Sequence, residues 1–386
     1  MVFADSAATT PVRREVLEAM WPYLAGGSDS VFGNPSSHHE VGERAAEALA
    51  QAREAIAQRL GCRPSEVILT SGGTESDNLA IKGIALAAPR GKHLVSIATE
   101  HEAVLESLGY LERIHGFEVE LLPLAPSGLV HVEHLLEALR PDTTLVTIAH
   151  ANNEIGTVQP IAELAAVARE GGVPFHTDAV QSAGWLDVGI GGPAGLGVDA
   201  LSVSGHKLGA PKGVGALALR GGIPLEPLVH GGGQERGRRS GTENVAGAVA
   251  LAVALELAAA ERPGVSAVAE ARDALIEGVL DAVPSAILTG SPEHRLPNHA
   301  SFCFPGTSGE AVLLELERRG VTCSSGSACA AGSDEPSHVL IALGIAPEIA
   351  QAAVRFTLGH EATRADAEAI VARTRDAVGA VGSLRG

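Results

Sequence analysis

The stretch VPFHTDAVQS (residues 173–182) places Asp178 directly after a short apolar run. The next apolar run along the chain, ALSVSGHKLG (200–209), ends close to Lys207. Short apolar runs separated by helical segments are typical of an α/β domain with a largely parallel sheet. Ligands of such sheets bind beyond the carboxyl ends of the strands. We therefore expect Asp178 and Lys207 to lie at the ligand-binding edge of the sheet.

The same alternation continues on both sides of these two runs. Helical spacing of apolar residues separates most of the further predicted strands, which are 66–71, 93–99, 144–150 and 215–220. After an alanine- and valine-rich helix at 244–260, ERPGVS (261–266) is typical of a boundary, and a smaller α+β pattern follows. We expect a large domain at 15–260 and a small domain formed by 1–14 and 261–386.

The composition excludes several classes of protein. With 386 residues, 45% of them hydrophobic and 19% charged, the chain has the composition of a soluble globular enzyme with more than one packed unit. The formal net charge of −18 argues against direct contact with nucleic acid, although ERGRRSG (235–241) is a local basic cluster. Four cysteines without a CxxC pair indicate neither a metal site nor a disulfide framework, which favours a reducing, cytoplasmic location.

Two features bear on membranes and targeting. The N-terminus has no basic region followed by a long apolar run, so we expect no signal peptide. The helix at 244–260 could span a membrane, but it contains Glu256 and little Leu or Phe. A helix buried between domains or subunits fits this composition better, and we expect no membrane partner.

A possible phosphate site follows the first predicted strand. In TSGGTESDN (70–78), a glycine turn precedes a helix, and the exposed amide groups of such a turn can hold a phosphate. The stretch lacks both the GK[ST] ending of a nucleotide P-loop and the GxGxxG of a dinucleotide fold. The alternative is a tight strand-to-helix turn capped by Thr74.

Three features together indicate a cofactor. Alone, Asp178 could be a helix cap or part of a structural ion pair, and Lys207 could be a solvated surface group. Combined with a phosphate cradle, they supply what pyridoxal phosphate requires: a Schiff-base lysine, an acid that keeps the pyridinium nitrogen charged, and an anchor for the phosphate. ATEHEAV (98–104) adds His101, whose ring could stack on the cofactor and exchange protons. Its alternative is a histidine at a helix start.

The sequence resembles the cysteine desulfurases of the iron–sulfur-cluster assembly type, which are pyridoxal-phosphate-dependent members of the class V aminotransferase family. The resemblance covers almost the whole chain through DSAATTP, FGNPSSHH, TSGGTESDNLAIKG, TEHEAV, HANNEIGTVQP, HTDAVQS, SVSGHKLGAPKGVGAL, HGGGQERGRRSGTEN, SSGSAC, EPSHVL and VRFTLG. It implies an aspartate-aminotransferase-like fold (fold type I) and a homodimer. It also implies conversion of L-cysteine to L-alanine, with the sulfur passed through an enzyme persulfide to an acceptor or cluster-scaffold protein.

The resemblance also implies roles for individual residues. Lys207 would form the Schiff base, Asp178 would bind the pyridinium nitrogen, and His101 would stack on the ring. The remaining cofactor-binding positions would be Gly73, Thr74, Asn153, Gln181, Ser204, His206 and, across the subunit interface, Thr242. Asn34 and Arg355 would grip the substrate carboxylate, which suits the planar guanidinium of an arginine.

Cys329 lies at the family's persulfide-forming position. It falls in CSSGSACAAGS (323–333), whose small residues predict a mobile loop, about 323–335, that could carry sulfur from the cofactor to an acceptor. His101 or the substrate amine could deprotonate the thiol, and the sequence does not decide between them. Cys323, Cys62 and Cys303 are interpreted as small buried residues, with a redox role for Cys323 as the alternative.

Other functions fit parts of the pattern. A selenocysteine lyase, an aminotransferase or an epimerase could use the same scaffold, but the last two need no nucleophilic thiol. A catalytically silent sulfur-relay subunit would not need Lys207, Asp178, His101 and Cys329 together. A nucleotide-binding protein is disfavoured by the missing GK[ST]. The sequence does not identify the sulfur acceptor.

Overall fold

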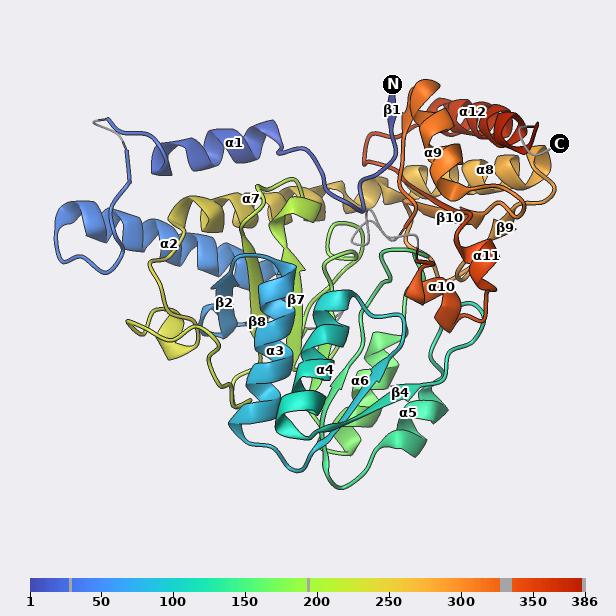
Figure 1. Cartoon of the computed structure of the whole chain (residues 1–386). Coiled ribbons are helices and arrows are strands. Elements are labelled where there is room, and N and C mark those ends of the chain that lie inside the picture. The colour runs from blue at the N-terminus through green and yellow to red at the C-terminus, as the bar shows by residue number, and fades with distance from the viewer. Residues whose placement is uncertain (28–29, 193–194, 327–334, 384–386) are drawn as a thin grey trace.

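The computed structural model of the chain describes residues 1–27, 30–192, 195–326 and 335–383 (Figure 1). Its main sheet has seven strands in the order β2-β8-β7-β6-β5-β3-β4. Their bounds are β2 Val67–Thr70, β3 His93–Ile97, β4 Glu118–Leu122, β5 Thr143–Thr147, β6 Phe175–Asp178, β7 Ala200–Ser204 and β8 Gly215–Leu219. Among these strands, β8 alone runs opposite to the other six. The expected α/β architecture with a largely parallel sheet is confirmed.

Helices cover both faces of the main sheet. Side chains alternate along each strand, so that Val67 and Leu69 of β2 face one apolar cluster while Ile68 faces the other. One face packs against α3 (Gly73–Ala87) and α4 (Glu102–His115). The other face packs against a larger set of helices, which are α1 Arg14–Met20, α2 Glu40–Arg59, α5 Val132–Ala138, α6 Ile161–Glu170 and α7 Val245–Glu261. This layering buries the central strands on both sides.

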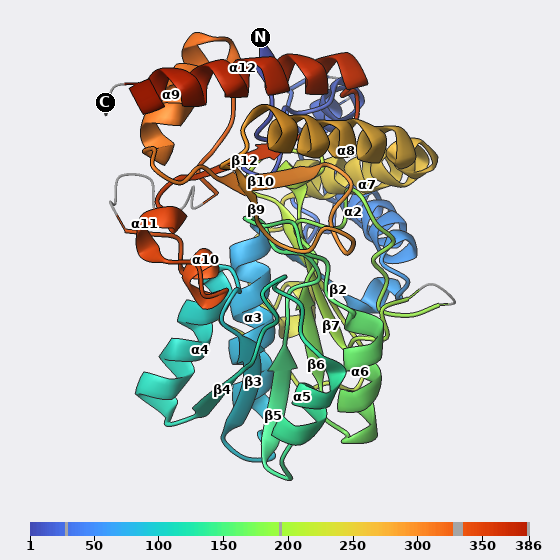
Figure 2. The ribbon, with the colours of Figure 1, turned by 90° about the vertical axis from the view of Figure 1, so that its right-hand side faces the viewer.

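A second group of elements lies above the main sheet, as Figure 2 shows. It contains a three-stranded antiparallel sheet in the order β12-β10-β9 and a parallel pair of β1 with β11. The strands are β1 Val2–Phe3, β9 Ile287–Leu288, β10 His299–Cys303, β11 Val321–Thr322 and β12 Ala353–Thr357. The helices are α8 Val265–Ala282, α9 Gly309–Arg318, α10 His338–Ala342, α11 Pro347–Ala350 and α12 Arg364–Ser383. The N-terminus thus joins a group otherwise built from the C-terminal part of the chain.

Most of the predicted elements are present, with two differences. The strand β4 was not expected, because its edge position leaves it half-exposed and its sequence mixes glutamates with apolar residues. The predicted boundary at ERPGVS is a 3₁₀ turn, Arg262–Gly264, that leads from α7 directly into α8. The proposed division into domains remains a prediction.

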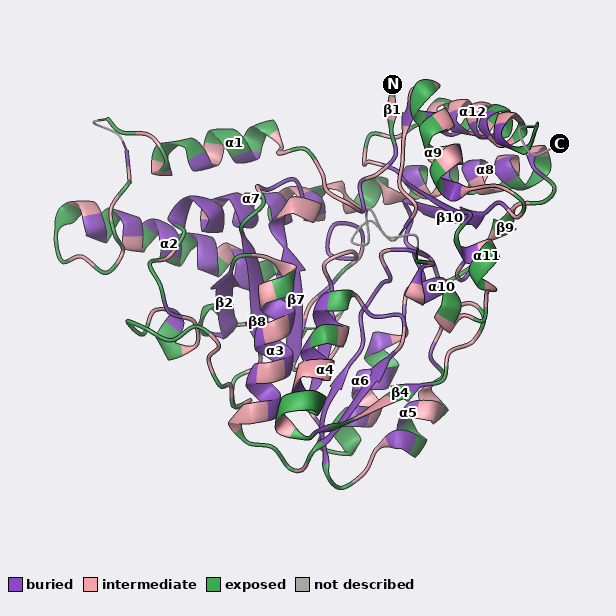
Figure 3. Cartoon of the chain, in the orientation of Figure 1, coloured by how far each residue is buried: buried purple, intermediate pink, exposed green. Residues whose placement is uncertain are grey.

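The apolar helix α7 is covered by protein on most of its surface. Ten of its residues are buried, and Figure 3 shows it lying along α2. Among the helices that the structure describes, none combines the length and apolarity needed to cross a membrane.

A buried ion pair ties the basic segment to the main sheet. Arg53 of α2 donates two hydrogen bonds to Glu235, at 2.6 and 2.7 Å, and both side chains are buried. The Leu69 amide also donates to Glu235, at 3.1 Å. This carboxylate therefore connects α2, β2 and the segment ERGRRSG.

Removing Glu235 should destabilise the protein strongly, because it leaves the Arg53 guanidinium buried without its partner. We expect Glu235→Ala to lower the free energy of unfolding by about 3–5 kcal/mol, measured by urea denaturation. Glu18→Ala, which breaks the exposed pair between Arg14 and Glu18, serves as the control and should change little. Equal effects of the two substitutions would contradict this prediction.

Candidate active site

A cavity of about 850 Å³ lies where the two groups of elements meet. Asp178 at the end of β6 and Ser204 at the end of β7 line it from the main sheet. Arg355 of β12 lines it from the second sheet. The cavity therefore lies at the carboxyl edge of the main sheet, as the sequence predicted.

Ten of the predicted site residues line this cavity, namely Gly73, Thr74, His101, Asn153, Asp178, Gln181, Ser204, His206, Lys207 and Arg355. Asn34 and Thr242 do not line it and are exposed, so their predicted roles require that they reach another site. Cys329 lies outside the described residues. Gly326 and Glu335, on either side of the undescribed segment, both line the cavity.

The start of α3 forms one wall of the cavity. Its N-cap is Gly72, with φ of 153°, and no described side chain caps the helix. A side-chain carbon at Gly73 would lie 2.7 Å from Val180 Cγ2, so only glycine leaves the backbone open here. The alternative in which Thr74 caps the helix is wrong. Uncapped amide groups at the positive end of a helix dipole suit an anion.

Three carboxyl groups are buried around the end of β6. Burial raises the pKa of Asp77 and of Glu100 well above the usual carboxyl range. Burial also raises the pKa of Asp178, while the Val180 amide, His101 and Lys207 lower it. The Val180 amide donates to Asp178 Oδ1 at 2.8 Å. Because several neighbouring buried carboxyl groups cannot all be charged at low cost, the negative charge is best placed on Asp178, whose pKa Lys207 lowers.

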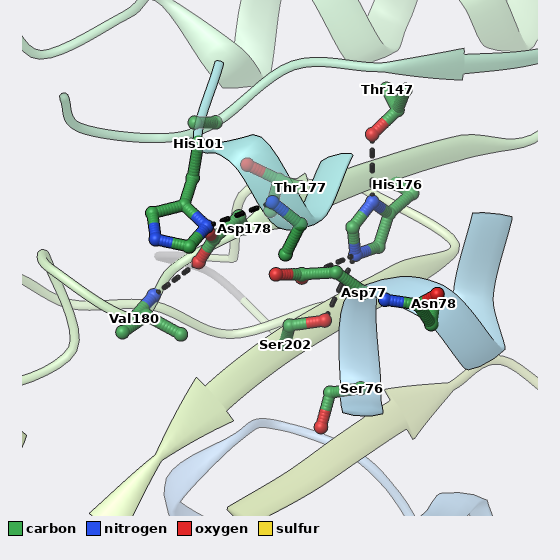
Figure 4. A network of polar contacts seen from close by, with 12 residues as sticks. Ser76, Asp77, Asn78, His101, Thr147, His176, Thr177, Asp178, Val180 and Ser202 are labelled. Atoms are coloured by element: carbon green, nitrogen blue, oxygen red, sulfur yellow. Dashed lines mark hydrogen bonds and ion pairs between the residues drawn. The ribbon is translucent and has the colours of Figure 1, made fainter. Parts of the chain in front are cut away.

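A neutral histidine lies beside this cluster and supports it (Figure 4). His176 lies on β6, and its ring nitrogens contact Thr147 Oγ1 at 2.8 Å and Ser202 Oγ at 3.0 Å. Its Nε2 is 3.7 Å from Asp77 Oδ1. Burial lowers the pKa of His176 to about 3, so the ring is neutral at pH 7. This network fixes the strand that carries Asp178 without adding a charge.

His101 is both a helix cap and a cavity residue. It is the N-cap of α4, where its Nδ1 accepts a hydrogen bond from the Ala103 amide at 3.0 Å. The cap orients the ring, and Figure 4 shows it beside Asp178. His101 is therefore both a histidine at a helix start, as in the alternative interpretation, and a residue that lines the cavity.

Backbone carbonyl groups of the N-terminal segment bind the side chain of Lys207. Lys207 follows β7 in the 3₁₀ turn Gly205–Lys207, and its Nζ donates to the carbonyls of Ala7 and Ala8, the latter at 2.8 Å. Gln181 Nε2 also donates to the Ala7 carbonyl, at 3.1 Å. Lys207 is thus held at the cavity by backbone oxygens.

The neighbouring His206 also lines the cavity, and burial lowers its pKa to about 4.

Arg355 is 1% exposed and is fixed by three acceptors. Its Nη1 donates to the carbonyls of Asn153 at 2.8 Å and Gly326 at 3.2 Å, and its Nη2 donates to Asp5 Oδ1 at 2.8 Å. Its Nε has no acceptor among the described residues. The guanidinium is therefore rigid and keeps donor capacity for a further carboxylate.

Sequence reasoning missed several residues that line the cavity, including Asp77 and Glu154, and others that support the lining residues, including Glu100 and Asp5. Asp77 and Glu100 lie inside the quoted motifs, but the sequence does not show that their side chains are buried. Asp5 and Ala7 lie in DSAATTP, and Glu154 lies in HANNEIGTVQP. Membership of these motifs was the signal in the sequence that could have identified these residues. The described residues contain no cluster of His, Cys, Asp and Glu that could hold a metal ion.

Comparison with known proteins places the chain among characterised sequences. Residues 2–370 match the family model for class-V aminotransferases. A cysteine desulfurase IscS of Dictyoglomus turgidum is 48% identical, with 95% of this chain and 91% of the relative covered. An IscS-like cysteine desulfurase of Mycobacterium tuberculosis is 46% identical, covering 96% of this chain and 94% of the relative.

Solved structures show the same fold. A NifS-like protein superimposes with a TM-score of 0.88 at 36% identity, covering 97% of this chain and 98% of that chain. A structure described as SspA in complex with cysteine gives a TM-score of 0.79 at 40% identity, covering 93% of this chain and 99% of that chain. The expected aspartate-aminotransferase-like, fold type I architecture is confirmed.

The geometry of Arg355 predicts how the cavity binds amino acids. Arg355→Lys keeps a positive charge but loses the fork of donors, so we expect about 10- to 100-fold weaker binding of L-alanine, measured by titration calorimetry with the cofactor supplied. The control is Arg295→Lys, because Arg295 is also buried but donates to backbone carbonyls away from the cavity lining. Equally weak binding by both variants would contradict the prediction that Arg355 binds the carboxylate of the amino acid.

Proposed function

The chain belongs to the class-V aminotransferase family and to its cysteine desulfurases, and we propose that its cavity binds pyridoxal 5'-phosphate and passes sulfur from L-cysteine to Cys329, releasing L-alanine. The observation that carries this proposal is the meeting of Asp178, Lys207 and the uncapped start of α3 around one cavity. The relatives named cysteine desulfurase cover nearly the whole chain.

The donor set around the cavity fits the proposed cofactor. Thr74, Ser204, His206 and the Gly73 amide would hold the phosphate at the start of α3. The buried Asp178 carboxylate would keep the ring nitrogen protonated, and His101 would lie against the ring. Asn153 and Gln181 would bind the phenolic oxygen. When bound, pyridoxal phosphate supplies an electron sink for the carbanion at the substrate's α-carbon.

The chain's own residues would perform the remaining tasks. Lys207 would link to the cofactor and, once displaced by the substrate amine, carry the proton of the α-carbon. Arg355 would hold the substrate carboxylate. The Cys329 thiolate would attack the substrate sulfur, so that a sulfur–sulfur bond forms and the bond between Cβ and sulfur breaks. The electron pair would stay with the carbon fragment, which takes up a proton and leaves as alanine.

The other cysteines support Cys329 as the sulfur acceptor. Burial raises the pKa of Cys62 and of Cys303 to about 12 and raises the pKa of Cys323 as well. Thiols with such pKa values remain protonated at pH 7 and are poor nucleophiles. This supports our interpretation of all three as structural residues.

A homodimer would complete the site. Thr242 is exposed and follows Arg239, which is tied to Glu75 of α3 at 2.8 Å. Asn34 is also exposed, and the nearby Trp21 and Phe32 expose large apolar side chains. Such surfaces favour contact with a second subunit, through which Thr242 would reach the partner's phosphate site. We also propose a cytoplasmic location and transfer of sulfur to an acceptor or scaffold protein for iron–sulfur cluster assembly or another thio-cofactor.

The assignment of Cys329 as the sulfur acceptor predicts that its substitution abolishes persulfide formation but not amino-acid binding. With cofactor and L-cysteine but no reductant, wild-type protein should gain one sulfur on Cys329, detected by mass spectrometry, and should release alanine. Cys329→Ser should lose the added sulfur but still bind L-alanine, because serine's hydroxyl cannot accept sulfur.

The matched control is Cys323→Ser, which should retain most of the activity. An added sulfur on Cys323 or Cys62 in the wild-type protein would overturn the assignment. Release of elemental selenium and alanine from selenocysteine, without turnover of L-cysteine, would favour the selenocysteine lyase alternative.

A further inference from the structure

Glu154 is a buried cavity residue to which neither the cofactor nor the substrate assignments give a role. It lies in the turn after β5 and is 6% exposed. Asn152 fixes this turn, since its Oδ1 accepts hydrogen bonds from the amides of Glu154 at 2.8 Å and Ile155 at 2.9 Å. Asn152 Nδ2 also donates to the Thr99 carbonyl at 2.7 Å. The backbone of Glu154 is therefore anchored to the main sheet.

The Glu154 carboxyl group binds the chain just after the Cys329 segment. The Ser337 hydroxyl donates to Glu154 Oε2 at 2.6 Å, and both residues are buried. The same hydroxyl accepts from the Leu340 amide as the N-cap of α10. Beside it, a ring nitrogen of His338 lies 3.0 Å from the Glu100 carbonyl. The chain is thus held from Ser337 onward.

The Glu154 side chain also lies near the chain just before that segment. Gly326 has φ of +90°, and a side-chain carbon built there would lie 3.5 Å from Glu154 Oε2 and 3.7 Å from Glu154 Cβ. The Gly326 carbonyl accepts from Arg355, and Ser324 pairs with Arg355 through the backbone. Glu154 therefore binds the chain after the Cys329 segment, whereas Arg355 holds the chain before it.

We propose that Glu154 is a positioning residue that fixes the chain after the Cys329 segment through Ser337, so that sulfur transfer depends on it more than amino-acid binding does. The proposal rests on the proposed function. The Glu154 carboxyl group ties Ser337 to the turn that also carries Asn153. Fixing one end of the segment lowers the entropy cost of bringing the thiol and the substrate together.

The test compares four variants. Glu154→Ala removes the hydrogen bond with Ser337, whereas Glu154→Gln keeps an oxygen that can accept from Ser337. Ser337→Ala removes the same hydrogen bond from the other side. Ser308→Ala is the matched control, because Ser308 caps α9 through the Ala311 amide without contacting the cavity.

We expect Glu154→Ala and Ser337→Ala to slow single-turnover formation of the Cys329 persulfide about tenfold, the effect of one lost hydrogen bond. The double variant should be affected less than the sum of the two single effects, because both changes remove the hydrogen bond between Ser337 and Glu154. Glu154→Gln should restore most of the rate. The affinity for L-alanine should remain that of the wild type in all of them.

Hydrogen exchange supplies a readout that does not depend on activity. In Glu154→Ala, the amides of 335–343 should exchange faster than in Ser308→Ala, with and without cofactor. Unchanged exchange, or a loss of L-alanine affinity parallel to the loss of persulfide formation, would overturn the proposal. A wild-type protein that forms neither alanine nor persulfide would instead refute the proposed function, while the exchange result would still test the Glu154 contacts.

Discussion

The burial of carboxyl groups at the end of β6 is the constraint on which the rest of the site depends. Asp77, Glu100 and Asp178 are all removed from water, and charging more than one of them is costly. Asp178 is the member that faces Lys207 and His101, so it is the best place for a negative charge. A buried anion at this position favours a cation opposite it, which is what a protonated pyridine ring offers.

The second group of elements supplies the arginine and the backbone oxygens that complete the cavity at the edge of the main sheet. Its strand β12 presents Arg355, and the N-terminal segment that pairs with it places backbone oxygens on Lys207. Buried contacts join the two groups, including Arg295, which donates to the Ile155 carbonyl. The turn with Asn153 and Glu154 lies at this junction. The cavity residues Asp178, Lys207 and Arg355 therefore share one frame.

Local patterns were enough to predict the strands and strand ends. Asp178 and Lys207 follow apolar runs, so their position at the sheet edge could be read from the sequence. The half-exposed β4 lacks such a run and was missed. The pairing of Val2 with Val321 and the burial of Asp77 depend on tertiary packing that no short motif encodes. A motif likewise does not show which subunit a residue serves. Only the resemblance led us to expect Thr242 to act across the interface, and Asn34 was placed in the site although it does not line this chain's cavity.

The most direct test of the account is the identity of the lysine that binds the cofactor. After incubation with pyridoxal phosphate and reduction with borohydride, peptide mass spectrometry should find the cofactor on Lys207. Lys207→Ala should lose the adduct, and Lys212→Ala, which changes an exposed lysine nearby, should keep it. An adduct on Lys212, or one that persists in Lys207→Ala, would contradict the placement of the cofactor between Asp178 and Lys207.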